Sequence, residues 1–215
     1  MMKQYFKIKE QNKDSILFFR LGDFYEMFYD DAKIASKELE LTLTGGQAER
    51  APMCGVPFHS CEGYIARLVA KGYKVAICEQ TEDPATAKGL VKRDIIRVIT
   101  PGTVMESSML DEGRNNYICC MFSDSKKIGL CFCDISTGEL YATEISGSDS
   151  VNSLTSQLAS YNPREILIGG DIVKIKSLPA FIKSKLSAGV EMLRDESFDN
   201  KLCTDTVNMQ FGEEM

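Results

Sequence analysis

The sequence has no run of about 18 uninterrupted apolar residues, the length that a membrane-spanning helix requires. Residues 1–12 are polar and lack the apolar segment found in export signals. Histidine occurs once, at His59, and the eight cysteines form no C-x-x-C pair, so a zinc site is not expected. These absences predict a cytoplasmic protein with reduced cysteines that binds no metal and no membrane.

Charge is distributed unevenly along the 215 residues, whose net charge is −6. This balance differs from the basic footprint of a general nucleic-acid binder. Up to Thr103 the chain has 15 basic and 14 acidic residues, and after it 10 and 17. The nearly neutral first half could still contact DNA through a local patch, whereas the acidic second half favours a function other than DNA binding. The length allows two small domains, and we predict two.

The first half predicts alternating helices and strands, as in an α/β protein. The helix at 24–40 is amphipathic, with Asp23 as its N-cap. A loop is expected at 45–57, where two prolines flank residues 53–56. Pro101-Gly102 is the candidate domain boundary. The expected helices are 1–12, 24–40 and 62–71, and the expected strands are 16–21, 41–44, 74–78 and 93–100.

The second half predicts a different order of elements. Three strand-like runs joined by short turns indicate an antiparallel meander, and alternating helices and strands follow. This is a ribonuclease-H-like order. The chain stops at Met215 without a recognisable capped element, which leaves open that the last domain is cut short. The expected strands are 117–122, 128–135, 139–145, 165–168 and 190–193, and the expected helices are 151–160 and 171–186.

The segment Gly22-Asp23-Phe24-Tyr25-Glu26-Met27-Phe28 allows three interpretations. In the first, Asp23 and Glu26 form a capping box and the aromatic residues belong to the core. In the second, Phe24 projects beyond the core, where its flat ring could stack on a base or wedge between base steps. Glu26 would then make one hydrogen bond to a base edge while repelling intact duplex. In the third, the two carboxylates hold a metal ion, although no histidine supports them.

Residues 19–32, FRLGDFYEMFYDDA, resemble the amino-terminal signature of the MutS family, the bacterial proteins that recognise DNA mismatches. Three further blocks follow in the order of the family: PMCGVPFH at 52–59, CEQ at 78–80 with Asp83-Pro84, and RVITPGT at 97–103. From residue 117 onwards the match is looser, chiefly DISTG at 134–138, Asn162-Pro163 and QFG at 210–212.

The resemblance implies a mixed α/β mismatch-binding domain at 1–103, a linker at 104–115 and a ribonuclease-H-like connector domain at 116–215. It implies that Phe24 enters the minor groove and stacks on the mispaired base, and that Glu26 hydrogen-bonds this base. DNA would be kinked at the defect, where bending is cheapest. Implied partners are mismatched double-stranded DNA and, through the connector, a MutL-type protein. A nucleoid-associated bacterial protein is expected.

The family carries a P-loop ATPase, yet the sequence contains no G-x-x-x-x-G-K-[ST] motif. We therefore expect a non-enzymatic fragment without a cofactor, and place ATP, Mg²⁺ and homodimer formation in the full-length protein. Further DNA contacts are less specific. Met53 could lie near the groove or be a core methionine, and exposed basic residues could contact phosphates or be merely solvated. These basic candidates are Arg50, Lys88, Lys92, Arg93 and Arg97.

Two other functions remain open at this point. A ribonuclease-H-like domain could house a metal-dependent nuclease in which Asp134 binds Mg²⁺, with Asp124 and Glu144 as the nearest other acidic residues. Alternatively, Phe24 and Glu26 are buried and the chain is a noncatalytic interaction scaffold. Solvent exposure of Phe24 distinguishes the scaffold from the wedge.

Overall fold

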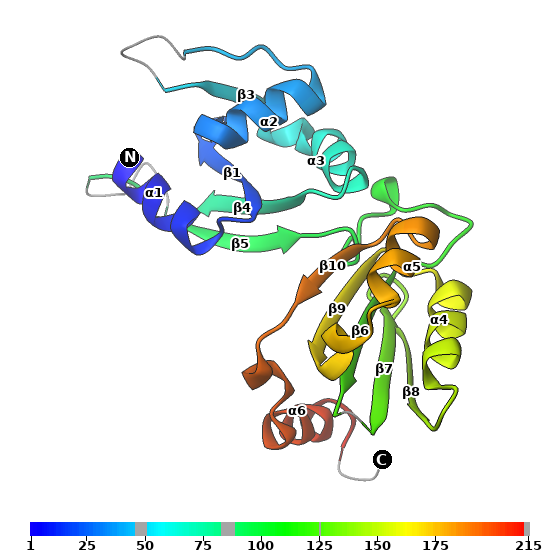
Figure 1. Ribbon diagram of the computed structural model, residues 1–215. Helices are drawn as coiled ribbons and strands as arrows, with labels where there is room; N and C mark the ends of the chain where they lie inside the picture. The colour runs from blue at the N-terminus through cyan, green and yellow to red at the C-terminus, as the bar shows by residue number, and fades with distance from the viewer. Residues whose placement is uncertain (46–50, 83–88, 125, 213–215) are drawn as a thin grey trace. The chain divides into compact units, whose positions relative to one another are not determined.

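The computed structural model describes residues 1–45, 51–82, 89–124 and 126–212 (Figure 1). These residues form two compact units, Met1–Leu110 and Asp111–Met215. Each unit is built on its own five-stranded mixed sheet. Within the described ranges, no helix combines the length and the apolar character needed to cross a lipid bilayer.

The sheet of the first unit has the strand order β3-β2-β1-β4-β5. The central strand β1 runs parallel to β4, and the pairings β1–β2, β2–β3 and β4–β5 are antiparallel. Central position explains why β1 is an almost continuous apolar run, since both of its faces are covered. The strands are β1 (Ser15–Leu21), β2 (Phe24–Phe28), β3 (Met53–Pro57), β4 (Lys74–Gln80) and β5 (Arg93–Ile99).

Helices cover both faces of this sheet. On one face, α2 (Tyr29–Leu39) and α3 (Cys61–Ala70) bury apolar side chains against Phe18 and its neighbours. On the other face, α1 (Met2–Gln11) packs on Phe19 and Phe28. The helices predicted at 1–12 and 62–71 and the strands at 16–21, 74–78 and 93–100 are therefore confirmed. The strand predicted at 41–44 is wrong, since Thr44 forms only an isolated bridge to Met53.

The predicted helix at 24–40 begins too early, because residues Phe24–Phe28 form a strand. This segment pairs with β1 on one side and with β3 on the other. These pairings stabilise a strand here, although the spacing of the apolar residues would also fit a helix. The helix starts only at Tyr29, with Phe28 in the N-cap position. Asp23 is thus a turn residue, and the capping-box interpretation is wrong. The predicted loop likewise ends earlier, because Met53–Pro57 is strand β3.

Part of the segment predicted as a linker belongs to the first unit. Val104 is buried in the core beneath α2 and α3, and Met109 and Leu110 pack against the same core. A short 3₁₀ helix, η2 (Ser107–Met109), contacts α3. The apolar side chains at 104, 109 and 110 explain why this stretch is anchored rather than free.

The sheet of the second unit has the order β10-β9-β6-β7-β8. Strands β6, β7 and β8 form the predicted antiparallel meander, and β9 is parallel to both β6 and β10. The predicted ribonuclease-H-like order and the mixed α/β class are confirmed. The strands are β6 (Tyr117–Ser123), β7 (Lys127–Asp134), β8 (Glu139–Ser146), β9 (Glu165–Gly170) and β10 (Gly189–Met192).

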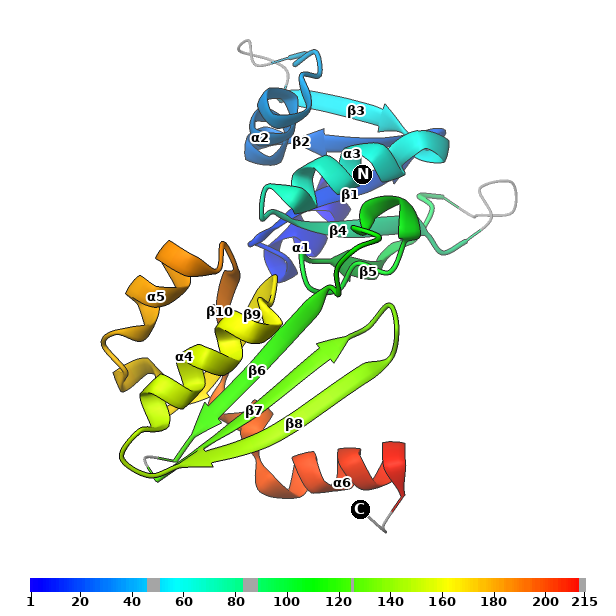
Figure 2. The same ribbon diagram turned by 90° about the vertical axis from the view of Figure 1, so that its right-hand side faces the viewer.

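Helices α4 (Ser150–Tyr161) and α5 (Leu178–Lys185) share one apolar core on a single face of this sheet (Figure 2). The helix predicted at 171–186 is split into η3 (Asp171–Lys174) and α5, since Pro179 favours a new helix start. On the opposite face, Phe198 of η4 (Asp195–Phe198) stacks on Phe122 with ring centroids 4.8 Å apart.

One helix was missed by sequence reasoning: α6 (Asn200–Phe211). The Asp199 side chain caps it by accepting from the Leu202 N–H. None of its residues is buried, so it has no strong apolar stripe to mark it.

Candidate nucleic-acid interface

Phe24 is presented at the tip of a β-hairpin. Leu21 of β1 pairs with Phe24 of β2, so the turn consists of Gly22 and Asp23 alone. Gly22 has a φ of 56°, which matches a type II′ hairpin turn with glycine at its first central position. Phe24 follows this turn directly and leaves 46% of its surface exposed. A phenyl ring exposed to this extent is available to a ligand.

The alternation of β2 separates its core residues from its ligand candidates. Tyr25 and Met27 point into the core beneath α2 and α3. Phe24, Glu26 and Phe28 lie on the opposite face, because every second residue of a strand shares a side. Phe24 and Glu26 are therefore neighbours on one face, about 7 Å apart along the strand.

Helix α1 covers only one end of this face. The Tyr5 hydroxyl donates to the Phe28 carbonyl oxygen at 3.2 Å, and the Tyr5 ring meets the Phe28 ring edge-on at 5.1 Å. Phe28 is consequently buried, whereas Glu26 is half-buried and Phe24 is exposed. The same strand face thus serves as core at Phe28 and as open surface at Phe24.

In the sheet, Glu26 pairs with Phe19 on β1 and with Gly55 on β3. Burial raises the pKa of Glu26, because desolvation disfavours the charged form. Among the residues that the structure describes, no hydrogen bond or ion pair engages this carboxyl group. It can donate a hydrogen bond when protonated and accept one when ionised.

Two of the predicted phosphate contacts are occupied within the protein. Arg93 is buried, and its guanidinium donates to the carbonyl oxygens of Arg20 at 2.7 Å and Val91 at 2.9 Å. Arg97 forms an ion pair with Glu106 and donates to the Thr103 carbonyl oxygen at 3.1 Å. Both guanidinium groups thus have partners within the protein, and their contact with DNA phosphates stays a prediction.

The remaining candidates are placed as follows. Met53 pairs with Phe28 in the β2–β3 ladder and packs against the core on the α1 side of the sheet. These surroundings agree with the interpretation of Met53 as a core methionine. Lys92 is exposed just before β5 and stays a predicted phosphate contact. Arg50 and Lys88 lie outside the described residues.

Asp134 of the second unit is engaged in a turn. It is 1% exposed and accepts hydrogen bonds from the N–H groups of Asn116 and Ser136, each at 2.9 Å. Burial alone would raise the pKa of Asp134, but these hydrogen bonds and that of the Ser136 hydroxyl lower it overall. Glu144 pairs with Lys127 at 2.8 Å. No group of three potential metal ligands occurs in the part of the chain that the structure describes.

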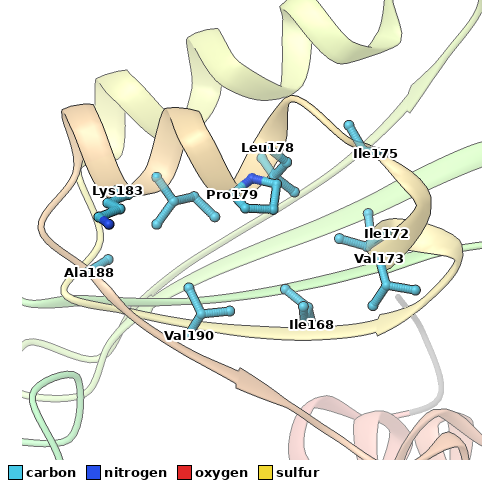
Figure 3. A pocket seen from close by; sticks show the side chains of 10 residues that line it. Ile168, Ile172, Val173, Ile175, Leu178, Pro179, Lys183, Ala188 and Val190 are labelled. Atoms are coloured by element: carbon cyan, nitrogen blue, oxygen red, sulfur yellow. The ribbon is translucent and has the colours of Figure 1, made fainter.

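The second unit also contains an apolar pocket of about 290 Å³ (Figure 3). Its walls come from β9, β10, η3 and α5, and Lys183 is its one charged lining residue. Aliphatic side chains offer neither a nucleophile nor a general acid or base. The apolar lining residues of the pocket are Ile168, Ile172, Val173, Ile175, Leu178, Pro179, Ile182, Ala188 and Val190.

Comparison with known protein families shows that the chain matches two consecutive domains of a single family. The family model of MutS domain I matches residues 1–108, and that of MutS domain II matches residues 116–215. The chain belongs to the MutS family, which confirms the resemblance carried by the sequence blocks.

Several curated relatives are each named DNA mismatch repair protein MutS. That of Acetivibrio thermocellus is 50% identical over 98% of this chain and 25% of its own length. That of Ruminiclostridium cellulolyticum is 54% identical over 93% of this chain and 23% of its own length. That of Clostridium tetani is 51% identical over 92% of this chain and 22% of its own length. The chain spans about a quarter of the length of these relatives.

Proposed function

We propose that the first unit recognises mispaired or unpaired bases in double-stranded DNA and that the full-length protein acts in DNA mismatch repair. The Phe24 ring enters the minor groove and stacks on the mispaired base, and the Glu26 carboxyl group hydrogen-bonds this base. One observation carries the proposal: an exposed ring and a half-buried carboxyl group share the uncovered end of one sheet face. The names of the curated relatives support the same role.

The physics of a mismatch fits this arrangement. Wedging a ring between base steps costs a few kcal/mol of lost stacking in intact duplex. A mispaired or unpaired base has already lost part of that energy, so both stacking and kinking are cheaper there. A carboxylate two residues from the wedge repels the phosphates of intact DNA. Discrimination then depends on the deformability of the duplex more than on its sequence.

The exposure of Phe24 argues against the alternative of a scaffold in which both residues are buried. The decisive experiment replaces Phe24 with Ala in the full-length protein and compares its affinity for mismatched and matched duplex by fluorescence anisotropy. Because base–aromatic stacking contributes about 1–3 kcal/mol, we expect the mismatched-to-matched affinity ratio to fall by roughly tenfold. Phe211→Ala, which removes an exposed phenylalanine from α6 of the second unit, is the matched control. An unchanged ratio in Phe24→Ala refutes the wedge.

Glu26→Gln tests the carboxyl group separately. The amide keeps hydrogen-bonding capacity and removes the repulsion of phosphates. We expect tighter binding to matched duplex and a lower affinity ratio. Equal discrimination by wild type and variant would contradict the role given to Glu26.

DNA bending has its own measurement. Energy transfer between dyes at the two ends of a mismatched duplex should rise when the protein binds, and the rise should be smaller with Phe24→Ala. If binding leaves energy transfer unchanged, the kink is not part of the mechanism.

We further propose that the second unit is a connector that contacts a MutL-type partner. Its excess of acidic residues favours a charged protein interface over a DNA interface. ATP and Mg²⁺ binding, and a homodimer, belong in this proposal to the full-length protein. Titration of a MutL-type protein against the full-length protein should give an affinity that weakens as salt rises. A salt-independent affinity would contradict an electrostatic interface.

A further inference from the structure

Arg20 lies beneath the hairpin that carries Phe24, on the other face of the sheet. It pairs with Tyr25 in the β1–β2 ladder, so its side chain starts on the side of Tyr25 rather than that of Phe24. The side chain is only 15% exposed. Arg20 can therefore influence Phe24 through the turn without reaching the surface on which Phe24 lies.

The guanidinium of Arg20 makes three contacts at once. Nε donates to the Gly22 carbonyl oxygen at 2.6 Å, within the turn itself. Nη1 forms an ion pair with Glu79 Oε1 at 3.1 Å, at the end of β4. The guanidinium carbon lies 3.5 Å from the centre of the Phe58 ring, a cation–π stack. The turn is thereby tied to two further elements of the first unit.

Each of these partners is itself held in place. The Phe58 N–H donates to the carbonyl oxygen of Asp23 at 3.0 Å, so the residue that stacks on Arg20 also fastens the second turn residue. Glu79 accepts a hydrogen bond from the Tyr25 hydroxyl. Burial, followed by this hydrogen bond, raises the pKa of Tyr25, which keeps the hydroxyl protonated as a donor.

A two-residue turn with φ of 56° at Gly22 has few internal constraints, because glycine is the most permissive residue. Two hydrogen bonds from outside the turn constrain it instead: Arg20 Nε donates to the Gly22 carbonyl oxygen, and the Phe58 N–H donates to that of Asp23. Phe24 follows this turn immediately, so its orientation depends on both bonds. A small displacement of a binding group is enough to lose much of its interaction.

We propose that Arg20 is a positioning residue for mismatch recognition: by fixing the Gly22-Asp23 turn, it sets the direction in which the Phe24 ring is presented to DNA. This inference rests on the proposed role of Phe24. It assigns to Arg20 no contact with DNA. Lysine is a poor substitute, because one ammonium group cannot donate to the turn, pair with Glu79 and stack flat on Phe58 together.

The experiment compares Arg20→Met and Arg20→Lys with wild type in the full-length protein. The mismatched-to-matched affinity ratio should fall about fivefold for Arg20→Met and less for Arg20→Lys, while affinity for matched duplex stays within twofold. Arg67→Met is the matched control, since the guanidinium of Arg67, like that of Arg20, donates to main-chain carbonyl oxygens, here those of Leu39 and Glu38 at the end of α2. It should leave the ratio unchanged.

Two readouts separate positioning from a merely structural role. Fluorescence of 2-aminopurine placed beside the mismatch reports base unstacking, and its increase on binding should shrink in Arg20→Met as it does in Phe24→Ala. In the Phe24→Ala background, Arg20→Met should cause no further loss of discrimination, as expected for residues that act as a unit. An equal further loss there overturns the proposal.

The outcomes distinguish this inference from the proposed function. If Phe24→Ala leaves the affinity ratio unchanged, the proposed function itself fails. If Phe24→Ala lowers the ratio and folded Arg20→Met does not, only the role of Arg20 fails. Should Arg20→Met not fold, Arg20→Lys decides by the same two readouts, and an unchanged ratio with unchanged fluorescence overturns the proposal.

Discussion

Gly55 lies directly opposite Glu26 in the antiparallel pairing of β3 with β2. A Cβ atom at this position would lie 3.2 Å from the Tyr25 carbonyl oxygen and 3.4 Å from Cγ of Glu26. The glycine therefore leaves bare main chain beside the Glu26 side chain. Glu26 therefore has no side chain opposite it on the β3 side.

Gly55→Ala should reduce mismatch discrimination about threefold, because the added methyl group would lie 3.2 Å from the Tyr25 carbonyl oxygen and the β2 main chain next to Glu26 must shift to accommodate it. The free energy of unfolding should change by less than about 1 kcal/mol, since alanine is favoured over glycine in a strand by about 0.5–1 kcal/mol. Both quantities are measured in the full-length protein, by anisotropy and urea unfolding. Gly129→Ala, at a strand position with more room, is the control. Unaltered discrimination in Gly55→Ala would contradict this account.

Glu26→Gln should make the protein more stable at pH 7. The pKa of Glu26 is raised in the folded state, so its protonated form favours folding and this contribution is lost as pH rises through the folded pKa. The side-chain amide in Glu26→Gln is neutral at pH 7, so the variant does not lose this stability as pH rises. The difference between variant and wild type should disappear below about pH 3, where the carboxyl group is protonated in both states. Urea unfolding at both pH values checks this, and a variant less stable at pH 7 would refute it.

Asp31 should be one of the most sensitive positions of the first unit. It is buried, and its carboxylate accepts from the Leu17 N–H at 3.0 Å and from Lys9 Nζ at 2.9 Å. Asp31→Ala removes the acceptor of the buried Leu17 N–H and of Lys9 Nζ. The free energy of unfolding in urea should therefore fall by about 2–4 kcal/mol. Asp30→Ala, which breaks an exposed pair with Lys33, should cost at most about 1 kcal/mol. Equal costs for the two would show that the buried contacts contribute little.

Asp134→Asn should lower the stability of the second unit, and most strongly at neutral pH. The pKa of Asp134 is lowered in the folded state, so its contribution is present above the unfolded pKa and lost as pH falls through the folded value. Thermal unfolding of wild type and variant should therefore converge in acid. Added Mg²⁺ should not change either midpoint at pH 7. If Mg²⁺ raised the unfolding midpoint of wild type but not of the variant, the result would support a metal site at Asp134.

The sequence predicted the second unit more completely than the hairpin of the first, and the reason is local. Strands β6 and β7 alternate between buried and less buried residues, and short turns join β6, β7 and β8. The spacing of Phe24 and Phe28, by contrast, fits both a helix and a strand. Their spacing of four fits a helix, and as an even number it also fits one face of a strand. Pairing of β2 with β1 and β3 decides between them, and no local window contains that information.

The basic residues show the same limit. A sequence shows that Arg93 is charged, but its acceptor at Arg20 lies 73 residues away. Arg97 finds its partner Glu106 after the boundary that Pro101-Gly102 had marked. Phe24 and Glu26 could be singled out because their signal lies in a short contiguous motif. Arg20 lies in the same motif, yet its contacts with Glu79 and Phe58 appear only in the fold.

The docking of α1 at Phe28 has a genetic consequence. The Tyr5 hydroxyl holds the last residue of the strand whose first residue is Phe24. Loosening this helix would tilt the strand at its anchored end and so disturb the opposite end. A selection for strains with elevated mutation rates should therefore recover changes at Tyr5 and Ile8 of α1. On the proposed function, such alleles lower mismatch discrimination although Phe24 itself is unchanged.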